Sequence, residues 1–134
     1  MSAKNVLIIG AVWVEPNSSA AGSRMLQLIE LFLGSNHQVH FATTTQKSEN
    51  AFDLTSLGVV EHSIQLNDTS FDKFVNSLQP TIVVFDRFMM EEQFGWRVEE
   101  NCPSALRILD TEDLHAVSKV RQASGKKGVD FTID

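Results

Sequence analysis

Short apolar runs recur along the chain and are separated by polar or helix-forming stretches. Residues 5–10 (NVLIIG) form a continuous run rich in β-branched side chains and closed by glycine, which is typical of a strand buried on both faces. Comparable or weaker runs predict further strands over residues 37–43, 59–66, 81–85 and 105–109. We therefore expect a sheet of five strands.

Apolar residues at helical spacing predict helices in most of the connections. The first of these helices ends at Gly34, and others are expected over residues 71–78, 89–100 and 114–122. This alternation of strands and helices predicts an α/β fold of Rossmann type, in which a parallel β-sheet is flanked by helices.

The length of 134 residues suits one domain rather than two. We place this domain at residues 1–123, with residues 124–134 as a linker or the start of a truncated remainder. The tail turns apolar at Val129, Phe131 and Ile133, so it looks interrupted rather than finished.

The composition narrows the classes of partner. The net charge is −6 and the largest basic cluster is the pair Lys126 and Lys127, so we expect no binding to nucleic acid. No segment approaches the roughly 20 apolar residues that cross a bilayer, so we expect no transmembrane segment. The single cysteine, Cys102, excludes an internal disulfide and a Cys-based zinc site, and is interpreted as a structural thiol. These features favour the cytoplasm, with attachment to the inner face of the membrane left open.

In a sheet of this type, ligands bind beyond the carboxyl ends of the strands. The loop after the first strand lacks both the Gly-x-Gly-x-x-Gly and the Walker pattern, which disfavours a standard dinucleotide or P-loop site. The remaining candidate is an anion site at the start of the first helix, where backbone N–H groups are free to bind a negative charge. Its residues are Ser19, Ala21, Gly22 and the cationic Arg24. A cap on the helix and a solvated Arg24 explain the same residues equally well.

Two other segments end at the same edge of the sheet. Asp86 and Arg87 follow a buried strand, either as ligand-binding residues or, as we favour, as a helix cap and its ion partner. Residues 110–115 (DTEDLH) crowd three carboxylates and one imidazole into six positions, which suits acid–base chemistry or the binding of a hydroxyl-rich ligand. A helix start with acidic residues is the alternative. Trp13 either stacks on a sugar or base, or covers the edge of the sheet.

Taken in order, these segments resemble the N-terminal half of the GT-B glycosyltransferases of the glycogen-synthase-like group. The resemblance spans residues 5–122 and rests on segments that match in the same order along the chain: Pro16, Ala21-Gly22, Arg24, Asn36-His37-Gln38-Val39, Asp86-Arg87-Phe88 and Asp110-Thr111-Glu112-Asp113-Leu114-His115. Ala21 and Asn36 replace two of the family's glycines.

The resemblance implies an acceptor-binding half of an enzyme that moves a sugar from a nucleotide-sugar donor to a glycan or lipid-linked acceptor, and that is inactive without a second domain. Its implied catalytic residues are Asp110, Asp113 and His115, and its implied substrate- or phosphate-binding residues are Ser19, Ala21, Gly22, Arg24, Asp86, Arg87 and Glu112. No metal and no cofactor is expected. The alternative is a flavodoxin-like or Rossmann-type binding or regulatory module without catalysis.

Overall fold

The computed structural model describes residues 4–17, 20–110, 118–121 and 131–133. These ranges hold a seven-stranded sheet in the order β3-β2-β1-β4-β5-β6-β7. Neighbouring strands among the first five pair in parallel, whereas β6 and β7 are antiparallel additions at one end. The strands are β1 (Asn5–Gly10), β2 (Gln38–Thr43), β3 (Val60–Ser63), β4 (Ile82–Asp86), β5 (Leu106–Asp110), β6 (Ser118–Arg121) and β7 (Phe131–Ile133).

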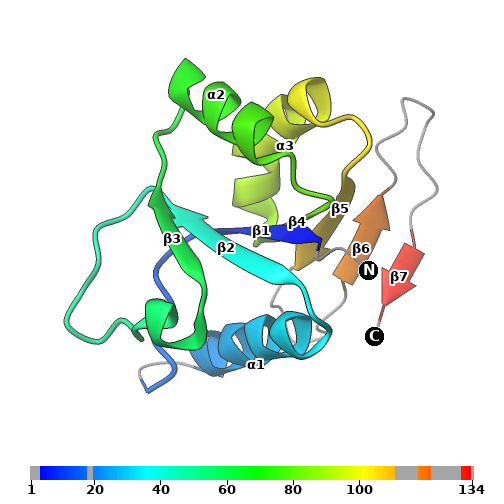
Figure 1. Cartoon of the computed structure of the whole chain (residues 1–134). Helices are drawn as coiled ribbons and strands as arrows, with labels where there is room; N and C mark the ends of the chain where they lie inside the picture. The colour runs from blue at the N-terminus through cyan, green and yellow to red at the C-terminus, as the bar shows by residue number, and fades with distance from the viewer. Residues whose placement is uncertain (1–3, 18–19, 111–117, 122–130, 134) are drawn as a thin grey trace.

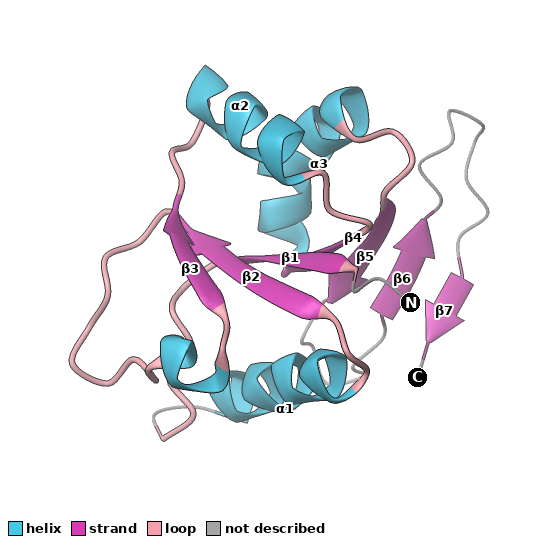
Figure 2. Cartoon of the chain, in the orientation of Figure 1, coloured by secondary structure: helices cyan, strands magenta, loops and turns pink. Residues whose placement is uncertain are grey.

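Helices cover both faces of this sheet, as Figures 1 and 2 show. Helix α1 (Ala20–Gly34) and the short 3-10 helix η1 (Leu54–Leu57) lie on one face. Helices α2 (Thr69–Leu78) and α3 (Phe88–Asn101) lie side by side on the other. The predicted Rossmann-like domain with a parallel sheet of five strands is therefore confirmed.

Strand β1 is the centre of the core because it pairs with β2 on one side and β4 on the other. Its residues from Val6 to Ile9 have no exposed surface. Leu7 and Ile9 pack with the side chains of α2 and α3, while Val6 and Ile8 pack with those of α1. Each such side chain contributes about 1.5–3 kcal/mol on full burial, which explains the uninterrupted apolar run.

The register places the ends of the parallel strands along one edge. Gly10 pairs with Thr43, and Thr43 pairs with Ser63. On the other side of β1, Asp86 pairs with Asp110. Sequence order reverses between β1 and β4, so the topological switch point, where ligands bind in such sheets, lies between Gly10 and Asp86.

The predicted helix over residues 114–122 is wrong at its described part, because Ser118–Arg121 forms β6. The strand pairs with β5 in antiparallel orientation and thereby satisfies backbone groups that β5 would otherwise expose at a sheet edge. The segment SKVR holds a single apolar residue, Val120, so its pattern distinguishes neither a strand nor a helix. β7 extends the same sheet, while the division proposed at residue 123 stays a prediction.

The loop that leaves β1 folds back against the start of α1 at Gly22. A Cβ atom on Gly22 would lie 2.6 Å from the carbonyl carbon and 3.0 Å from the amide nitrogen of Glu15. Both neighbours are main-chain atoms, so a side chain at this position requires the loop to move. Glycine is therefore needed here for close approach of two backbone segments.

We predict that Gly22→Ala lowers the free energy of unfolding by about 1–3 kcal/mol, as overpacking does. Gly34→Ala is the matched control in the same helix, because nothing lies within 4 Å of the added methyl group. It is expected to be neutral or to stabilise by up to about 1 kcal/mol, since alanine favours a helix. Urea unfolding of both variants measures the difference, and equal effects would refute the close contact at Gly22.

Candidate ligand site at the carboxyl edge of the sheet

Two adjoining hollows lie along the carboxyl edge, and Trp13 lines both of them. The first is at the switch point between β1 and β4. The second is beyond the ends of β2 and β3 and is the larger of the two, with a volume of about 460 Å³. This volume lies within the usual range of small-molecule sites, roughly 300–1,000 Å³.

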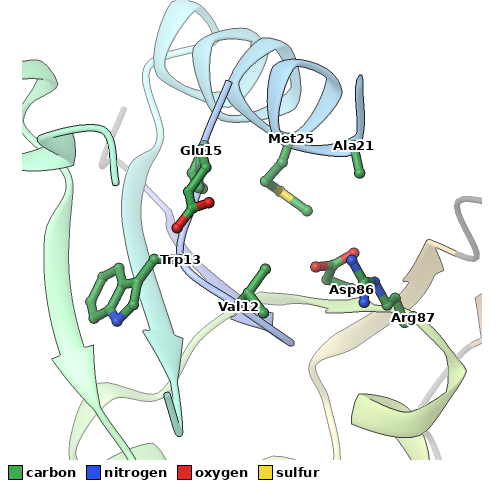
Figure 3. Close-up of a pocket in the computed structure, with 9 residues that line it drawn as sticks. Val12, Trp13, Glu15, Ala21, Met25, Asp86 and Arg87 are labelled. Carbon is green, nitrogen blue, oxygen red and sulfur yellow. The ribbon is translucent and has the colours of Figure 1, made fainter. Parts of the chain in front are cut away.

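The first hollow is a narrow space of about 40 Å³ between the β1–α1 loop, α1 and the end of β4. Figure 3 shows Met25 of α1 and Asp86 of β4 pointing toward one another across it. Ala21 and Gly22 line it from α1, and Arg87 lines it beside Asp86. The structure thus brings four of the expected site residues around one cavity.

The loop after β1 helps to hold Asp86 in place. Its carboxylate accepts a hydrogen bond of 3.4 Å from the amide of Ala11, and its side chain is buried. The N-cap of α3 is Arg87, with no side-chain cap bond, so the interpretation of Asp86 as the cap of that helix is wrong. Arg87 itself has φ 79° and ψ 152°, a backbone conformation that is essentially confined to glycine. Its amide donates to the carbonyl of Asp110 at 2.7 Å, which helps to hold this strained turn.

Arg24 and Asp110 form an ion pair instead of lying apart in solvent. The Nη2 atom of Arg24 lies 2.8 Å from Oδ1 of Asp110, which is almost fully buried, while the Arg24 side chain is 36% exposed. Arg24 therefore bridges α1 and the end of β5. The pair borders a separate small apolar cavity that is lined by Leu28, Phe32, Val84 and Ile108.

Trp13 separates the two hollows and belongs to the core. It is 6% exposed, its ring packs on Phe41 at 5.5 Å between centroids, and its indole N–H donates to the carbonyl of Thr45 at 2.9 Å. The indole points away from the first hollow and toward β2 in Figure 3. Of the two interpretations of Trp13, the structure shows the one in which it covers the sheet.

Sequence reasoning missed the second hollow entirely. Its lining is polar, with hydroxyl, amide, carboxylate, ammonium and imidazole groups from Thr44, Thr45, Gln46, Lys47, Glu61, His62 and Ser63. Lys47 and Glu61 pair with each other at 2.9 Å, and the Lys47 ammonium lies 5.4 Å from the centre of the Trp13 ring. The sequence feature that could have indicated this hollow is the predicted parallel sheet. In such a sheet, the segment after β2 ends at the same edge as the segments after β1 and β4.

Four of the expected residues fall outside the part of the chain that the structure describes: Ser19, Glu112, Asp113 and His115. Their roles stay predictions, as do those of Asp110 and the residues around the first hollow. Within the described ranges, no group of three or more His, Cys, Asp or Glu side chains is placed to hold a metal ion. Cys102 is buried, and burial raises the pKa of its thiol, which agrees with a structural role.

No protein-family model and no curated protein matches the chain. Among solved structures, it is similar to the MycE methyltransferase of the mycinamycin biosynthetic pathway in complex with Mg and SAH, with a TM-score of 0.54, 18% identity and coverage of 83% of this chain. A second MycE structure, which also holds mycinamycin VI, gives a TM-score of 0.52 at 19% identity over 81% of this chain. A putative Zn-dependent alcohol dehydrogenase from Rhodobacter sphaeroides gives 0.53 at 15% identity over 84%.

These similarities establish the fold alone. The chain spans 28% and 27% of the two MycE chains and 42% of the dehydrogenase chain. The expected membership of the GT-B glycosyltransferases is wrong: the structural neighbours are methyltransferases bound to SAH and a Rossmann-like dehydrogenase. The expected sugar transfer is wrong for the same reason. So are the expected partners, a nucleotide-sugar donor and a glycan or lipid-linked acceptor.

The physical reason for this error is that the ordered matches were features of the fold. A strand, a small-residue helix start and acids after later strands recur in many Rossmann-type domains, whatever ligand they bind. No helix in the described ranges is long and apolar enough to cross a membrane. An association with the inner face of the membrane stays a prediction.

We predict that Arg24→Gln lowers the free energy of unfolding by about 1.5–3 kcal/mol, the range for hydrogen bonds to charged groups, because it removes an ion partner of the buried Asp110 carboxylate. Arg107→Gln is the control, since its 3.5 Å pair is with the half-exposed Glu99 and is worth less than about 1 kcal/mol. Chemical denaturation distinguishes them. If Arg24→Gln lowers the free energy of unfolding no more than Arg107→Gln does, the ion pair between α1 and β5 contributes no more to stability than a surface ion pair.

Proposed function

We propose that this chain is the ligand-binding domain of an enzyme and that it binds a phosphate-free nucleoside ligand of the S-adenosyl class, to which SAH belongs. The observation that carries the proposal is the pair of adjoining hollows at the switch-point edge, with the space beside Gly22 filled by the main chain of Glu15.

The filled space beside Gly22 argues against a phosphate ligand at this position. Dinucleotide sites hold the pyrophosphate on the N-terminus of the first helix, where a glycine lets the ligand approach the backbone. Here the close approach at Gly22 is taken by the main chain of Glu15. The edge is also not basic: Glu15 and the buried Asp86 accompany Arg87 around the first hollow. A group that carries positive charge and no phosphate suits this set of side chains better.

The second hollow has the chemistry for a ribose and its attached base. Thr44, Thr45 and Ser63 bring hydroxyl groups to a space of about 460 Å³, and a hydroxyl both donates and accepts. The Glu61 carboxylate, already fixed by Lys47 and by the amide of Leu54, adds an acceptor. A ligand that spans both hollows would pass Trp13, which lines each of them.

The structural neighbours support this ligand class, because two MycE structures with the same fold contain SAH. The chain corresponds to less than a third of MycE, so an acceptor substrate and its binding surface would have to come from elsewhere. The proposed role is therefore cofactor binding within a larger methyl-transferring enzyme.

Thermal unfolding and calorimetry with SAH and with NADH test the proposal. We expect SAH to bind saturably and to stabilise the folded chain by about 2.7 kcal/mol at a hundredfold excess over Kd. NADH, which carries the diphosphate, should give no stabilisation under the same conditions. Binding of NADH without binding of SAH would overturn the proposal.

Ser63→Ala should weaken SAH binding by about threefold to tenfold, the usual net value of one hydrogen bond. Ser77→Ala, an exposed position on α2 outside both hollows, is the matched control and should leave Kd unchanged. Equal affinities of both variants and the natural chain would place the ligand away from the second hollow.

A further inference from the structure

Two histidines stack on each other beneath α2. Nδ1 of His40 lies 3.0 Å from Nε2 of His62, and the ring centroids are 5.2 Å apart with an interplanar angle of 23°. His40 is 8% exposed. His62 in turn contacts Phe74 of α2, with 4.6 Å between ring centroids. The pair thus lies between the sheet and an aromatic side chain, with His40 buried and His62 partly buried.

Strand geometry explains the pairing. His40 and Ala42 project to the same face of β2, and Ala42 belongs to the core formed with α2 and α3. In the register of β2 and β3, Ala42 pairs with His62 and His40 pairs with Val60. The two rings are therefore diagonal neighbours across the two strands.

The hydrogen bond between the rings requires one N–H donor and one unprotonated nitrogen. When both rings are neutral, one donates and the other accepts. A proton taken up at the accepting nitrogen removes the acceptor, and a second charged ring would stack on the first beside the apolar Leu7 and Phe74. The arrangement is compatible with neutral rings and incompatible with two imidazolium ions.

The charged groups of the adjoining elements are engaged elsewhere. Glu61 of β3 projects to the opposite face of its strand from His62 and pairs with Lys47. Asp72 of α2 pairs with Arg97 of α3 at 2.7 Å, and Lys73 of α2 is exposed. β1 meets His40 with the apolar Leu7, and α2 meets His62 with Phe74. None of these contacts supplies a carboxylate to compensate a charged pair.

We propose that the His40–His62 pair is an acid-sensitive latch that fastens β3 to the sheet and opens when the pair takes up protons. β3 is short, with four residues, and pairs only with β2 among the described strands. The latch stands independently of any ligand. Because His62 and Ser63 line the second hollow, opening would also change the shape of that hollow.

The direction of the pH effect follows from the pKa of each ring. Burial lowers the pKa of His40 below the ordinary value of 6.5, and burial together with the neighbouring His40 lowers the pKa of His62. The unfolded or released rings therefore bind protons first as the pH falls. The stabilisation is complete above pH 6.5 and is lost as the pH falls through 6.5 toward the lowered folded values.

Amide hydrogen exchange on the natural chain tests the latch. After correction for the intrinsic pH dependence of exchange, lowering the pH from 7.5 to 5.5 should lower the protection of the Ile64 amide, which bonds the carbonyl of Thr43, and of the β3 amides. Amides between β1 and β4 should keep their protection until global unfolding. Unchanged protection in β3, or equal losses in β3 and β1, would overturn the proposal.

A titration of the ring protons by NMR needs no variant. As the pH is lowered, both rings should still be neutral just below pH 6.5. At lower pH they should take up protons in coupled steps. Two independent rings that titrate at the ordinary value would refute the latch.

Unfolding of the variant His62→Gln, which retains a hydrogen-bonding group without a titrating ring, provides the second test. In the natural chain, each proton that only the unfolded state binds raises the unfolding equilibrium constant by up to about tenfold for each pH unit below 6.5. His62→Gln removes one such proton and should therefore make this rise less steep. His37→Gln, a substitution in another partly buried histidine ring that packs on Phe32, is the control and should retain the steep dependence on pH. If His62→Gln retains it and His37→Gln loses it, the proposal is wrong.

Discussion

The close contact between the main chain of Glu15 and Gly22 constrains the course of the loop after β1 along the carboxyl edge. The loop after β1 first reaches the segment after β2 at Trp13, and it then contacts α1 at Gly22, where the helix has no side chain. Trp13 is thereby set between two hollows, with its ring on Phe41 and its N–H on the carbonyl of Thr45. The amide of Ala11, at the start of the same loop, bonds the carboxylate of Asp86 and joins the ends of β1 and β4.

The same contact is part of the argument for the proposed ligand class. An open helix N-terminus is a ready anion site, and here the main chain of Glu15 fills the space beside Gly22. Arg24, the cation expected to hold a phosphate, forms an ion pair with Asp110 at the end of β5. The hydroxyl and carboxylate groups that line the two hollows are the basis for proposing a hydroxylated ligand without phosphate.

Much of the fold could be predicted because strands that are buried on both faces form continuous apolar runs in the sequence. The run Val6–Ile9 has to be apolar on both faces, and β4, which pairs with β1, follows the same pattern. β6 could not be predicted in this way, since four residues carry too little periodicity to separate a strand from a helix. Its formation depends on the open edge of β5, which is a tertiary constraint.

The candidate site was only half predictable for a similar reason. Asp86 and Asp110 could be placed at the edge because they follow apolar runs. The partner of Arg24 and the function of Gly22 depend on which chain segment folds over the helix, and that choice is absent from local patterns. The polar segment after β2 was visible as Thr44 to Lys47, and only the strand order shows that it faces the switch point.

The most direct test is an NMR titration of the isotope-labelled chain with SAH, because it locates the ligand on the fold. Binding at the carboxyl edge predicts shifts in the Trp13 indole N–H and in the amides of Thr44, Ser63 and Arg87. The amides of Gln38 and Thr81, at the opposite ends of their strands, should not move. Saturable shifts confined to that opposite end, or no shifts at all with SAH, would contradict the account.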